Sequence, residues 1–490
     1  MSNQWAGQDG AALLAGSRLA VLDEFRVPYS VESISTQPGW ACVRADNMEQ
    51  AVHWKTADSA QPRMSFAGDI PIVAAVVPES AVEEFAESLP GAWAPVLPIL
   101  DERGAEISSI WQSPDGGSIL PFDPNEAILA LRSERYLALC RTRTTTLSLA
   151  RHVYYRVRPL LPRRLQIALR RGFVRVQEGG AFPRWPTEPA LHDLAELILH
   201  LVARAAGQPL PTIAPWPSGY LWALVLTHDV ETARGRDTIG DVQTLELQCG
   251  YRSSWNLVPE RYTVTSDLVR GLLKAGFEVG VHGLRHDGRD LESRRTLERR
   301  LPEMRRWAER WRAYGFRAPA THRVWEWMPL LGFDYDSSYP DTDPYEPIAG
   351  GCCSWLPFFN ETLVELPITL PQDHTLFVVL GRSDQMWHDK AEFLRERGGM
   401  ALLITHPDYL VEEAHLAAYR RFLLAYADDA TAWKALPREV NTWWRARCET
   451  SLQLVDGEWK LAGPAAHEAA IAWVSPTSVP PARIELAHAV

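Results

Sequence analysis

Apolar and ionisable residues follow a regular pattern along the second half of the chain. Residues 221–226 form an apolar run that passes directly into Thr227-His228-Asp229-Val230-Glu231. Such a run is typical of a strand buried on both faces, and α/β folds place their sites at the C-terminal ends of such strands. An aspartate at this position can equally cap a following helix. The pattern predicts a buried strand that ends in a cap or in a site.

The alternation of strands and helices continues beyond this run. A helix is predicted over residues 265–274, with Thr265 as its N-cap and Gly276 as its stop, and a strand follows over residues 277–281. Alternation at this spacing predicts a parallel sheet, closed or open. The remaining predicted elements are a long charged helix at 291–314, a short helix at 325–331, and strands near 333–336 and 400–405.

The length of 490 residues exceeds what one hydrophobic core usually fills, and the pattern divides it into four parts. Residues 1–150 are predicted to form an N-terminal α/β domain with a structural or recognition role, and residues 151–210 a basic helical connector. The proline-rich residues 209–217 mark the start of the part that carries the parallel sheet, residues 211–412. Residues 413–490 are predicted to form C-terminal helices and a small β segment.

Composition and charge exclude several classes of function. A net charge of −11 argues against a nucleic-acid-binding surface along the whole chain, so we expect no nucleic-acid partner. The six cysteines contain no Cys-x-x-Cys pair and are expected to be reduced thiols. Residues 1–16 lack the pattern of a secretory signal, and no apolar run approaches the roughly 20 residues of a membrane span. We therefore expect a cytoplasmic protein.

Residues 151–175 are unusually basic, with tyrosines and leucines interleaved. Such a segment can make a peripheral contact with anionic lipid at the inner face of the membrane, or with a polyanionic glycan. It can equally be a solvated helical connector whose arginines pair with the acidic bulk of the protein, which we prefer. The arginines are Arg151, Arg156, Arg158, Arg163, Arg164, Arg170, Arg171 and Arg175.

Two histidines follow the predicted strand at 277–281. The His-x-x-x-His spacing of His282 and His286 places both imidazoles on one helical turn or at the mouth of a loop. Such a pair is a weak signal alone, but this one comes one βα unit after the strand of Asp229. A zinc-like divalent metal takes about three protein ligands and leaves a position for water. Asp229, His282 and His286 supply such a set.

Other ionisable residues stand at the ends of neighbouring predicted strands. Glu231 lies two residues after Asp229, so on a strand both carboxylates point to the same side. Arg317 and His406 each end a further strand. Buried charge is costly unless it is paired, so core packing does not explain why ionisable residues stand at the ends of several predicted strands. The residues predict one site at the C-terminal edge of the sheet.

In their order and spacing these segments resemble the motifs of the polysaccharide deacetylases, carbohydrate esterase family four. Residues 227–231 are similar to the family's Thr-Phe-Asp-Asp-Gly motif, and His282 with His286 to its His-x-x-x-His motif. Arg317 begins a segment similar to its Arg-x-Pro motif, and residues 402–406 are similar to its apolar strand ending in histidine. The resemblance implies a distorted (β/α)7 barrel between the N-terminal α/β domain and a helical C-terminal extension.

The resemblance also implies a function. The family's enzymes are metal-dependent deacetylases, so we expect removal of acetyl groups from a sugar of a surface polysaccharide or its precursor. The implied cofactor is a divalent metal, with Zn²⁺ first among the alternatives. The metal polarises the carbonyl and activates water, His406 protonates the leaving group, and Arg317 holds the catalytic base. Two other functions stay open: amide hydrolysis of a small non-sugar substrate, and glycan binding without catalysis.

The first motif departs from the family pattern, because Val230 stands where the family has its second aspartate. A direct overlay makes Asp229 the base and leaves the metal without a carboxylate unless Glu231 reaches it. The other assignment, which we prefer, gives Asp229 to the metal and the base role to Glu231, because a short side chain at a strand end is a stiff ligand. His228 is expected to pack in the core or to support the ligands.

Overall fold

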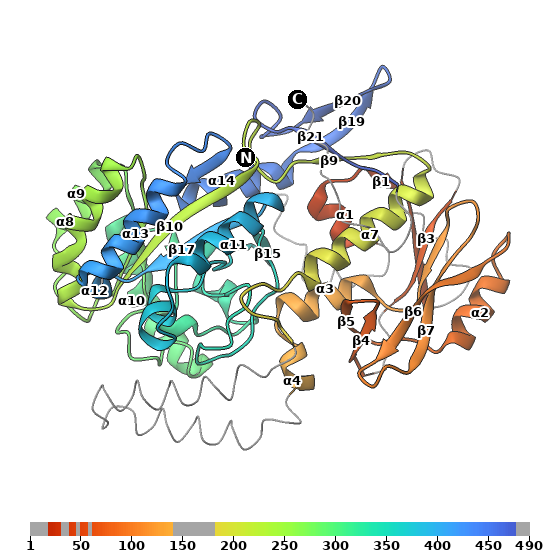
Figure 1. Ribbon diagram of the computed structural model, residues 1–490, viewed down its shortest axis with the longest axis horizontal. Coiled ribbons are helices and arrows are strands. Elements are labelled where there is room, and N and C mark those ends of the chain that lie inside the picture. The colour runs from red at the N-terminus through yellow and green to blue at the C-terminus, as the bar shows by residue number, and fades with distance from the viewer. Residues whose placement is uncertain (1–17, 31–38, 46–49, 57–60, 141–181, 477–490) are drawn as a thin grey trace. The chain divides into compact units, whose positions relative to one another are not determined.

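The computed structural model describes residues 18–30, 39–45, 50–56, 61–140 and 182–476 (Figure 1). The chain divides into two compact units. Unit 1 comprises Met1–Arg143, Pro189–Ser218 and Arg445–Val490, and unit 2 comprises Thr144–Glu188 and Gly219–Trp444. Within the described ranges, no helix combines the length and the apolar content that crossing a bilayer requires. All the predicted site residues lie in unit 2.

A mixed sheet forms the centre of unit 2. Its parallel strands follow one another in the order β16-β14-β13-β12-β11-β10-β17. They are β10 (Trp222–Val230), β11 (Ser254–Leu257), β12 (Glu278–Val281), β13 (Gly315–Phe316), β14 (Tyr335–Asp336), β16 (Leu363–Glu365) and β17 (Met400–Thr405). The strand β15 (Phe358–Asn360) is antiparallel to β16, and β18 (Ala432–Ala435) is parallel to β10.

The sheet curls, and the chain after β16 spans the gap between its two ends. The backbone N–H groups of Thr369 and Leu370 donate to the carbonyl of Leu402 in β17, at 3.3 and 3.1 Å. Ile368 forms a parallel bridge with Pro340 beyond β14. The predicted α/β class and parallel sheet are confirmed, and the curl agrees with the barrel that the resemblance implied.

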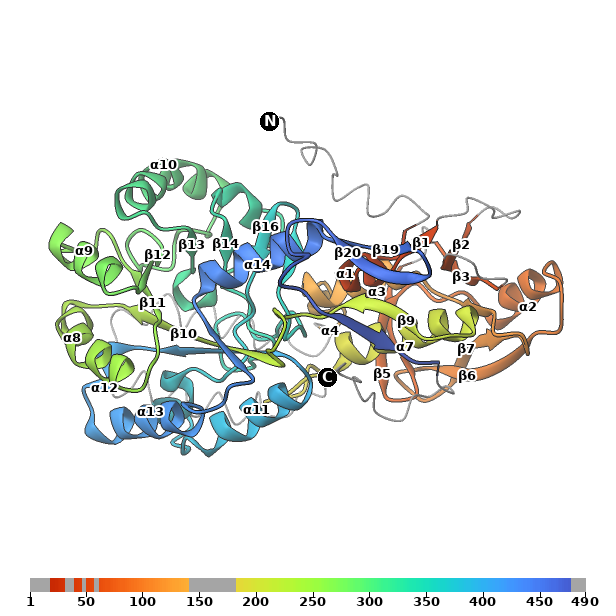
Figure 2. The same cartoon turned by 90° about the horizontal axis from the view of Figure 1, so that it is seen from above.

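Helices surround the strands of unit 2 (Figure 2). They are α8 (Ala233–Gln248), α9 (Ser266–Lys274), α10 (Arg294–Trp311), α11 (Gln385–Glu396), α12 (Pro407–Leu410), α13 (Glu413–Ala425) and α14 (Pro437–Glu449), with short turns at Pro319–Thr321 and Met328–Leu331 and a π-helix at His374–Val379. The α9 helix begins as predicted, because the Thr265 hydroxyl accepts from the N–H of Leu268. All nine residues of β10 are buried, so this strand is the apolar centre of the unit.

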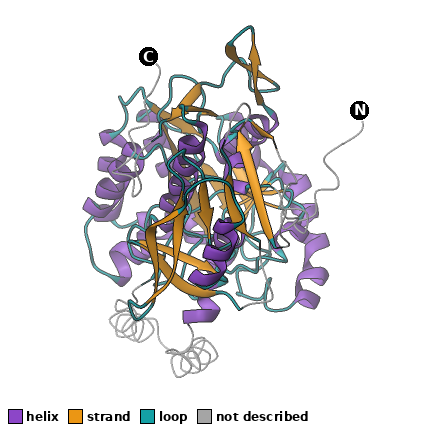
Figure 3. Cartoon of the chain, turned by 90° about the vertical axis from the view of Figure 1, so that its right-hand side faces the viewer, coloured by secondary structure: helices purple, strands orange, loops and turns teal. Residues whose placement is uncertain are grey.

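Unit 1 is built on a second sheet, with the strand order β1-β2-β3-β8-β7-β6-β4-β5. Its strands are β1 (Tyr29–Ser30), β2 (Trp40–Ala45), β3 (Val52–Lys55), β4 (Arg63–Ala67), β5 (Ile70–Ala74), β6 (Ala94–Asp101), β7 (Glu106–Gln112) and β8 (Ser118–Leu120). Its helices are α1 (Ala20–Phe25), α2 (Glu79–Glu87), α3 (Pro124–Arg132), α4 (Tyr136–Cys140) and α7 (Ala190–Ala206). The strands are drawn in orange in Figure 3.

The C-terminal residues add small sheets to unit 1. The strands β19 (Ser451–Val455) and β20 (Glu458–Ala462) form a hairpin. The strand β21 (Ile471–Val474) pairs with β9 (Leu210–Ile213). This pairing joins segments about 260 residues apart, so the units differ from the predicted division at residues 210 and 413.

Two further predictions fall on these regions. The helical stretch predicted after residue 412 is interrupted by β18, whose residues pair with β10. The basic segment 151–175 lies outside the described residues.

Candidate functional site

The predicted site residues meet at one edge of the sheet in unit 2. Adjacent parallel strands end at the same edge, and loops that follow them carry the functional groups of many α/β folds. Asp229 is the last but one residue of β10 and Glu231 follows that strand, while His282, Arg317 and His406 directly follow β12, β13 and β17. His286 lies in the loop after β12. The predicted convergence of strand ends is therefore present.

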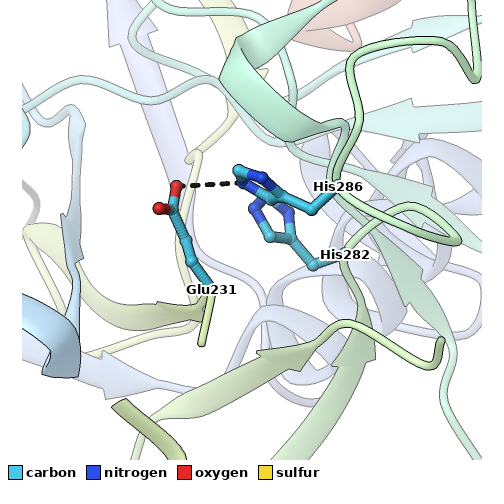
Figure 4. A group of neighbouring side chains, drawn as sticks. All are labelled: Glu231, His282 and His286. Atoms are coloured by element: carbon cyan, nitrogen blue, oxygen red, sulfur yellow. Dashed lines mark ion pairs between the residues drawn. The ribbon is translucent and has the colours of Figure 1, made fainter. Parts of the chain in front are cut away.

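Glu231, His282 and His286 form a group that can hold a metal ion (Figure 4). One ligand atom from each residue lies within 4.8 Å of the other two. Glu231 Oε1 is 3.0 Å from His286 Nε2, and the two imidazole rings are 5.0 Å apart. One carboxylate oxygen and two imidazole nitrogens are a donor set that suits zinc and similar divalent ions.

His282 is prepared to act as a ligand through Nε2. Its Nδ1 lies 3.0 Å from the carbonyl oxygen of Arg317, to which it donates, and this contact leaves the lone pair on Nε2. Burial lowers the pKa of His282 to about 4, although the carboxylate of Asp229 raises it. The ring is neutral at pH 7, which is the state that binds metals.

His286 is held by its backbone and by an arginine. Its φ of 55° lies in the left-handed region, where few residues other than glycine are found. Arg261 Nη1 lies 2.6 Å from Nδ1 of His286 and 3.1 Å from its carbonyl oxygen. Nε2 lies 3.0 Å from Glu231 Oε1 without an aligned hydrogen bond, so it is the atom of this ring that points into the ligand group.

Asp229 is held by partners other than the histidines. Its Oδ1 accepts from Asn256 Nδ2 at 2.9 Å and from Arg317 Nη1 at 3.0 Å. Burial raises the pKa of Asp229, but the guanidinium of Arg317 and the nearby histidines outweigh burial and lower it to about 2. The carboxylate is therefore ionised and fixed in direction.

The side chain of Arg317 is fully engaged. It donates to Thr227 Oγ1 at 2.8 Å and to the carbonyl and hydroxyl oxygens of Ser337, each at 2.7 Å. These contacts and that to Asp229 involve three of its nitrogens, which fixes the plane of the guanidinium. Arg317 thus orients Asp229, which is the base in the direct overlay and not in the preferred assignment.

His406 lies near Glu231 and is paired with Asp373. His406 Nδ1 is 2.6 Å from Asp373 Oδ1, and Nε2 is 3.9 Å from Glu231 Oε1. Burial lowers the pKa of His406, but Asp373 and the carboxylates of the site raise it to about 10. The imidazolium form persists at neutral pH. Asp373 was not predicted from the sequence, because it precedes a π-helix in a loop with no recognisable spacing to His406.

A pocket with a volume of about 440 Å³ opens beside Glu231. Its wall combines charged groups with an aromatic ring, and this mixture suits a polar substrate. The lining residues are Glu231, Thr232, Arg234, Val378, Asp408, Tyr409, Glu412 and His415.

The geometry differs from the preferred assignment of the two carboxylates. Asp229 was expected at the metal and Glu231 as the base, but Glu231 groups with the histidines. The strand continues to Val230, which leaves Asp229 inside it and against Arg317, whereas Glu231 is past its end and longer by one methylene. His282 Nε2 is 3.8 Å from Asp229 Oδ2, so Asp229 adjoins the group of Glu231, His282 and His286 without being one of its members.

His228 lies away from this group, on the opposite side of the strand. Its ring nitrogens contact Thr405 Oγ1 at 2.8 Å and Glu246 Oε1 at 2.7 Å, and the ring stacks on Trp255. It has the packing role that was expected.

Comparison with known proteins found no matching family model and no matching curated protein. Among solved structures, the chain is similar to a protein from Mycobacterium smegmatis named as a polysaccharide deacetylase, with 22% identity over 50% of this chain and 98% of that one and a TM-score of 0.40. It is similar to an allantoinase, with 18% identity over 47% and 92% of the two chains and a TM-score of 0.39. It is also similar to a family 4 carbohydrate esterase from Streptomyces lividans, with 13% identity over 53% and 100% and a TM-score of 0.29. One of these structures is named as a member of the family that the motifs resemble.

Proposed function

We propose that the protein is a metal-dependent hydrolase that removes acetyl groups from an acetylated sugar, in a surface polysaccharide or its precursor. The observation that supports it most is that Glu231 and Asp229 lie at one edge of the sheet and have different partners. The Glu231, His282 and His286 group fits a divalent ion, and Asp229 beside it is held ionised by Arg317. Metal-dependent hydrolysis of an acetyl group uses a Lewis acid to polarise the carbonyl and a carboxylate to take a proton from water.

The proposed reaction uses a bound ion and three side chains of the site. Glu231, His282 and His286 would hold a divalent ion, for which we propose Zn²⁺, and that ion would supply the Lewis acid that polarises the acetyl carbonyl and makes water a stronger acid. Asp229 takes the proton of the attacking water, and Arg317 keeps its carboxylate ionised and directed. His406, protonated at neutral pH, donates a proton to the departing amine or alkoxide. The pocket beside Glu231 would hold the sugar.

Removal of the metal is expected to abolish acetate release. Protein as purified is assayed on a panel of N- and O-acetylated sugars and glycans, then stripped with a chelator and reloaded with Zn²⁺. Activity should fall to background on stripping and return on reloading, because the proposed reaction needs the bound ion to polarise the acetyl carbonyl and to acidify the attacking water.

The same experiment distinguishes the rival functions. Acetate release that survives complete stripping contradicts the proposal. Retention of glycan without any acetate release would support a binding module, and hydrolysis of small non-sugar amides alone would support the other hydrolase.

Replacing Arg261 with alanine is expected to tighten metal binding about threefold to fivefold. The guanidinium donates to Nδ1 of His286 at 2.6 Å, which favours the tautomer with the proton on Nε2. A ring that binds a metal through Nε2 carries its proton on Nδ1, so the contact opposes binding. The side chain is exposed, and such a charged contact contributes up to about 1 kcal/mol.

The metal affinity of the Arg261→Ala variant is measured by competition with a chromophoric chelator. Arg285→Ala is the matched control, since this exposed arginine pairs with Glu260. Unchanged or weaker affinity in Arg261→Ala would show that the arginine does not oppose the ligand form of His286.

A further inference from the structure

Asp408 accepts hydrogen bonds from the segment that carries Glu231. It lies two residues after His406, in the short helix α12. Its Oδ2 accepts from the backbone N–H of Glu231 at 3.0 Å, and its Oδ1 accepts from the hydroxyl of Thr232. One carboxylate thus contacts two successive residues immediately beyond the end of β10.

The sheet itself does not fix Glu231. The register of β10 with β11 ends at Val230, opposite Leu257, and its register with β17 ends at His228. The backbone N–H of Glu231 is the first beyond the ladder and is partly buried, so it needs an acceptor outside the sheet. Asp408 supplies that acceptor, so the position from which the Glu231 side chain reaches the histidines depends on it.

The space around Asp408 is shaped for its carboxylate. Gly235, in the first turn of α8, is buried, and a Cβ atom there would lie 2.2 Å from Asp408 Oδ2. That distance is far below a van der Waals contact, so any larger residue at 235 would displace the carboxylate. A Cβ atom at Gly240 in the same helix would meet no described atom within 4 Å, so the requirement is specific to the turn that faces Asp408.

We propose that Asp408 is a positioning residue for the metal ligand Glu231. It allows this glutamate to replace the second aspartate of the family motif, at whose place this chain has Val230. The inference rests on the proposed metal site. Glu231 has one more rotatable bond than aspartate and starts beyond the strand, so its carboxylate samples more positions unless its backbone is fixed. Asp408 fixes that backbone and also ties it to the segment of His406, which places acid and ligand at a constant separation.

The test measures metal affinity in the full-length protein by competition with a chromophoric chelator, together with thermal unfolding. Asp408→Ala removes both acceptors, and its Zn²⁺ affinity should fall by roughly 10- to 100-fold, the usual effect of losing a residue that orients a ligand. Asp408→Asn keeps one carbonyl acceptor and should show a smaller loss.

Gly235→Ala tests the same contact without altering Asp408. It should weaken Zn²⁺ binding by displacing the carboxylate, whereas Gly240→Ala in the same helix should bind as the wild type does. Because alanine favours a helix, Gly235→Ala remains informative if Asp408→Ala fails to fold.

Asp429 provides a matched aspartate control. It accepts from the N–H and hydroxyl of Thr431 and from Trp222 Nε1 at the opposite end of β10. Asp429→Ala should lower the unfolding temperature and leave Zn²⁺ affinity unchanged. Wild-type affinity in both Asp408→Ala and Gly235→Ala would overturn the inference. Absence of Zn²⁺ binding in the wild type would instead overturn the proposed function.

Discussion

Loss of bound metal is expected in the Glu231→Ala variant, and loss of turnover with metal retained is expected in Asp229→Asn. Glu231 is the carboxylate grouped with His282 and His286, so its removal leaves only the two imidazoles as ligands and a much weaker site. Asp229 contacts Arg317 and Asn256, so its amide variant leaves the ligand group complete. Loss of a general base typically costs about 10²- to 10⁴-fold in rate, which is the fall expected in acetate release.

Elemental analysis of the purified variants measures the first effect and acetate release the second. Glu412→Ala is a suitable control for metal content, because this glutamate lines the same pocket but lies outside the ligand group. Metal retained in Glu231→Ala and lost in Asp229→Asn would restore the assignment in which Asp229 binds the metal and Glu231 acts as the base.

Asp229 and Glu231 have different environments because the strand β10 ends between them, at Val230. Side chains alternate along β10, so Asp229 and Glu231 point to the same side and Val230 points away. Asp229 still lies within the ladder and meets Arg317 from β13, whereas Glu231 is beyond the ladder and meets the loop after β12. A displacement of two residues along a strand moves a carboxylate by roughly 7 Å, which is enough to change its partners.

The local features of this site could be predicted from the sequence. The apolar run before Thr227 predicted β10, the Thr265 cap predicted the start of α9, and the histidine spacing predicted a pair of imidazoles after β12. The meeting of these segments at one edge followed from the parallel sheet, because parallel neighbours end together. Each of these predictions depends on residues close together in the chain or on one general rule of topology.

The remaining features depend on where the chain passes in space. Asp373 lies in the loop after β16 and Asp408 in the helix α12 after β17, and the spacing of Asp373 to His406 and of Asp408 to Glu231 carries no periodic signal. Which carboxylate meets the histidines depends on where the β10 ladder stops, and strand ends are the least predictable part of an element. The pairing of β9 with β21 likewise joins residues distant in sequence, so the extent of unit 1 was not apparent.

Replacing Asp373 with asparagine is expected to move the alkaline limit of activity toward neutral pH. Asp373 contacts His406 Nδ1 at 2.6 Å and contributes to raising the pKa of His406 to about 10, against the lowering effect of burial. A group with a raised pKa is protonated below that pKa and deprotonated above it, so the wild-type acid is lost only as pH rises through about 10. Without the Asp373 charge, the pKa of His406 falls toward the ordinary value of about 6.5 and the imidazolium is scarce at pH 8. Turnover at pH 8 should fall by roughly tenfold or more.

The pH profile separates this role of Asp373 from a structural one. A structural loss lowers the rate by the same factor at every pH, whereas loss of the charge moves the alkaline limb and spares activity at low pH. Asp384→Asn is the matched control, because Asp384 lies 3.8 Å from the ring of His388, which is not among the site residues. Its profile should coincide with that of the wild type. An Asp373→Asn profile that is lowered without displacement would show that the proton held on His406 does not limit turnover, and the leaving group would then take its proton from another donor.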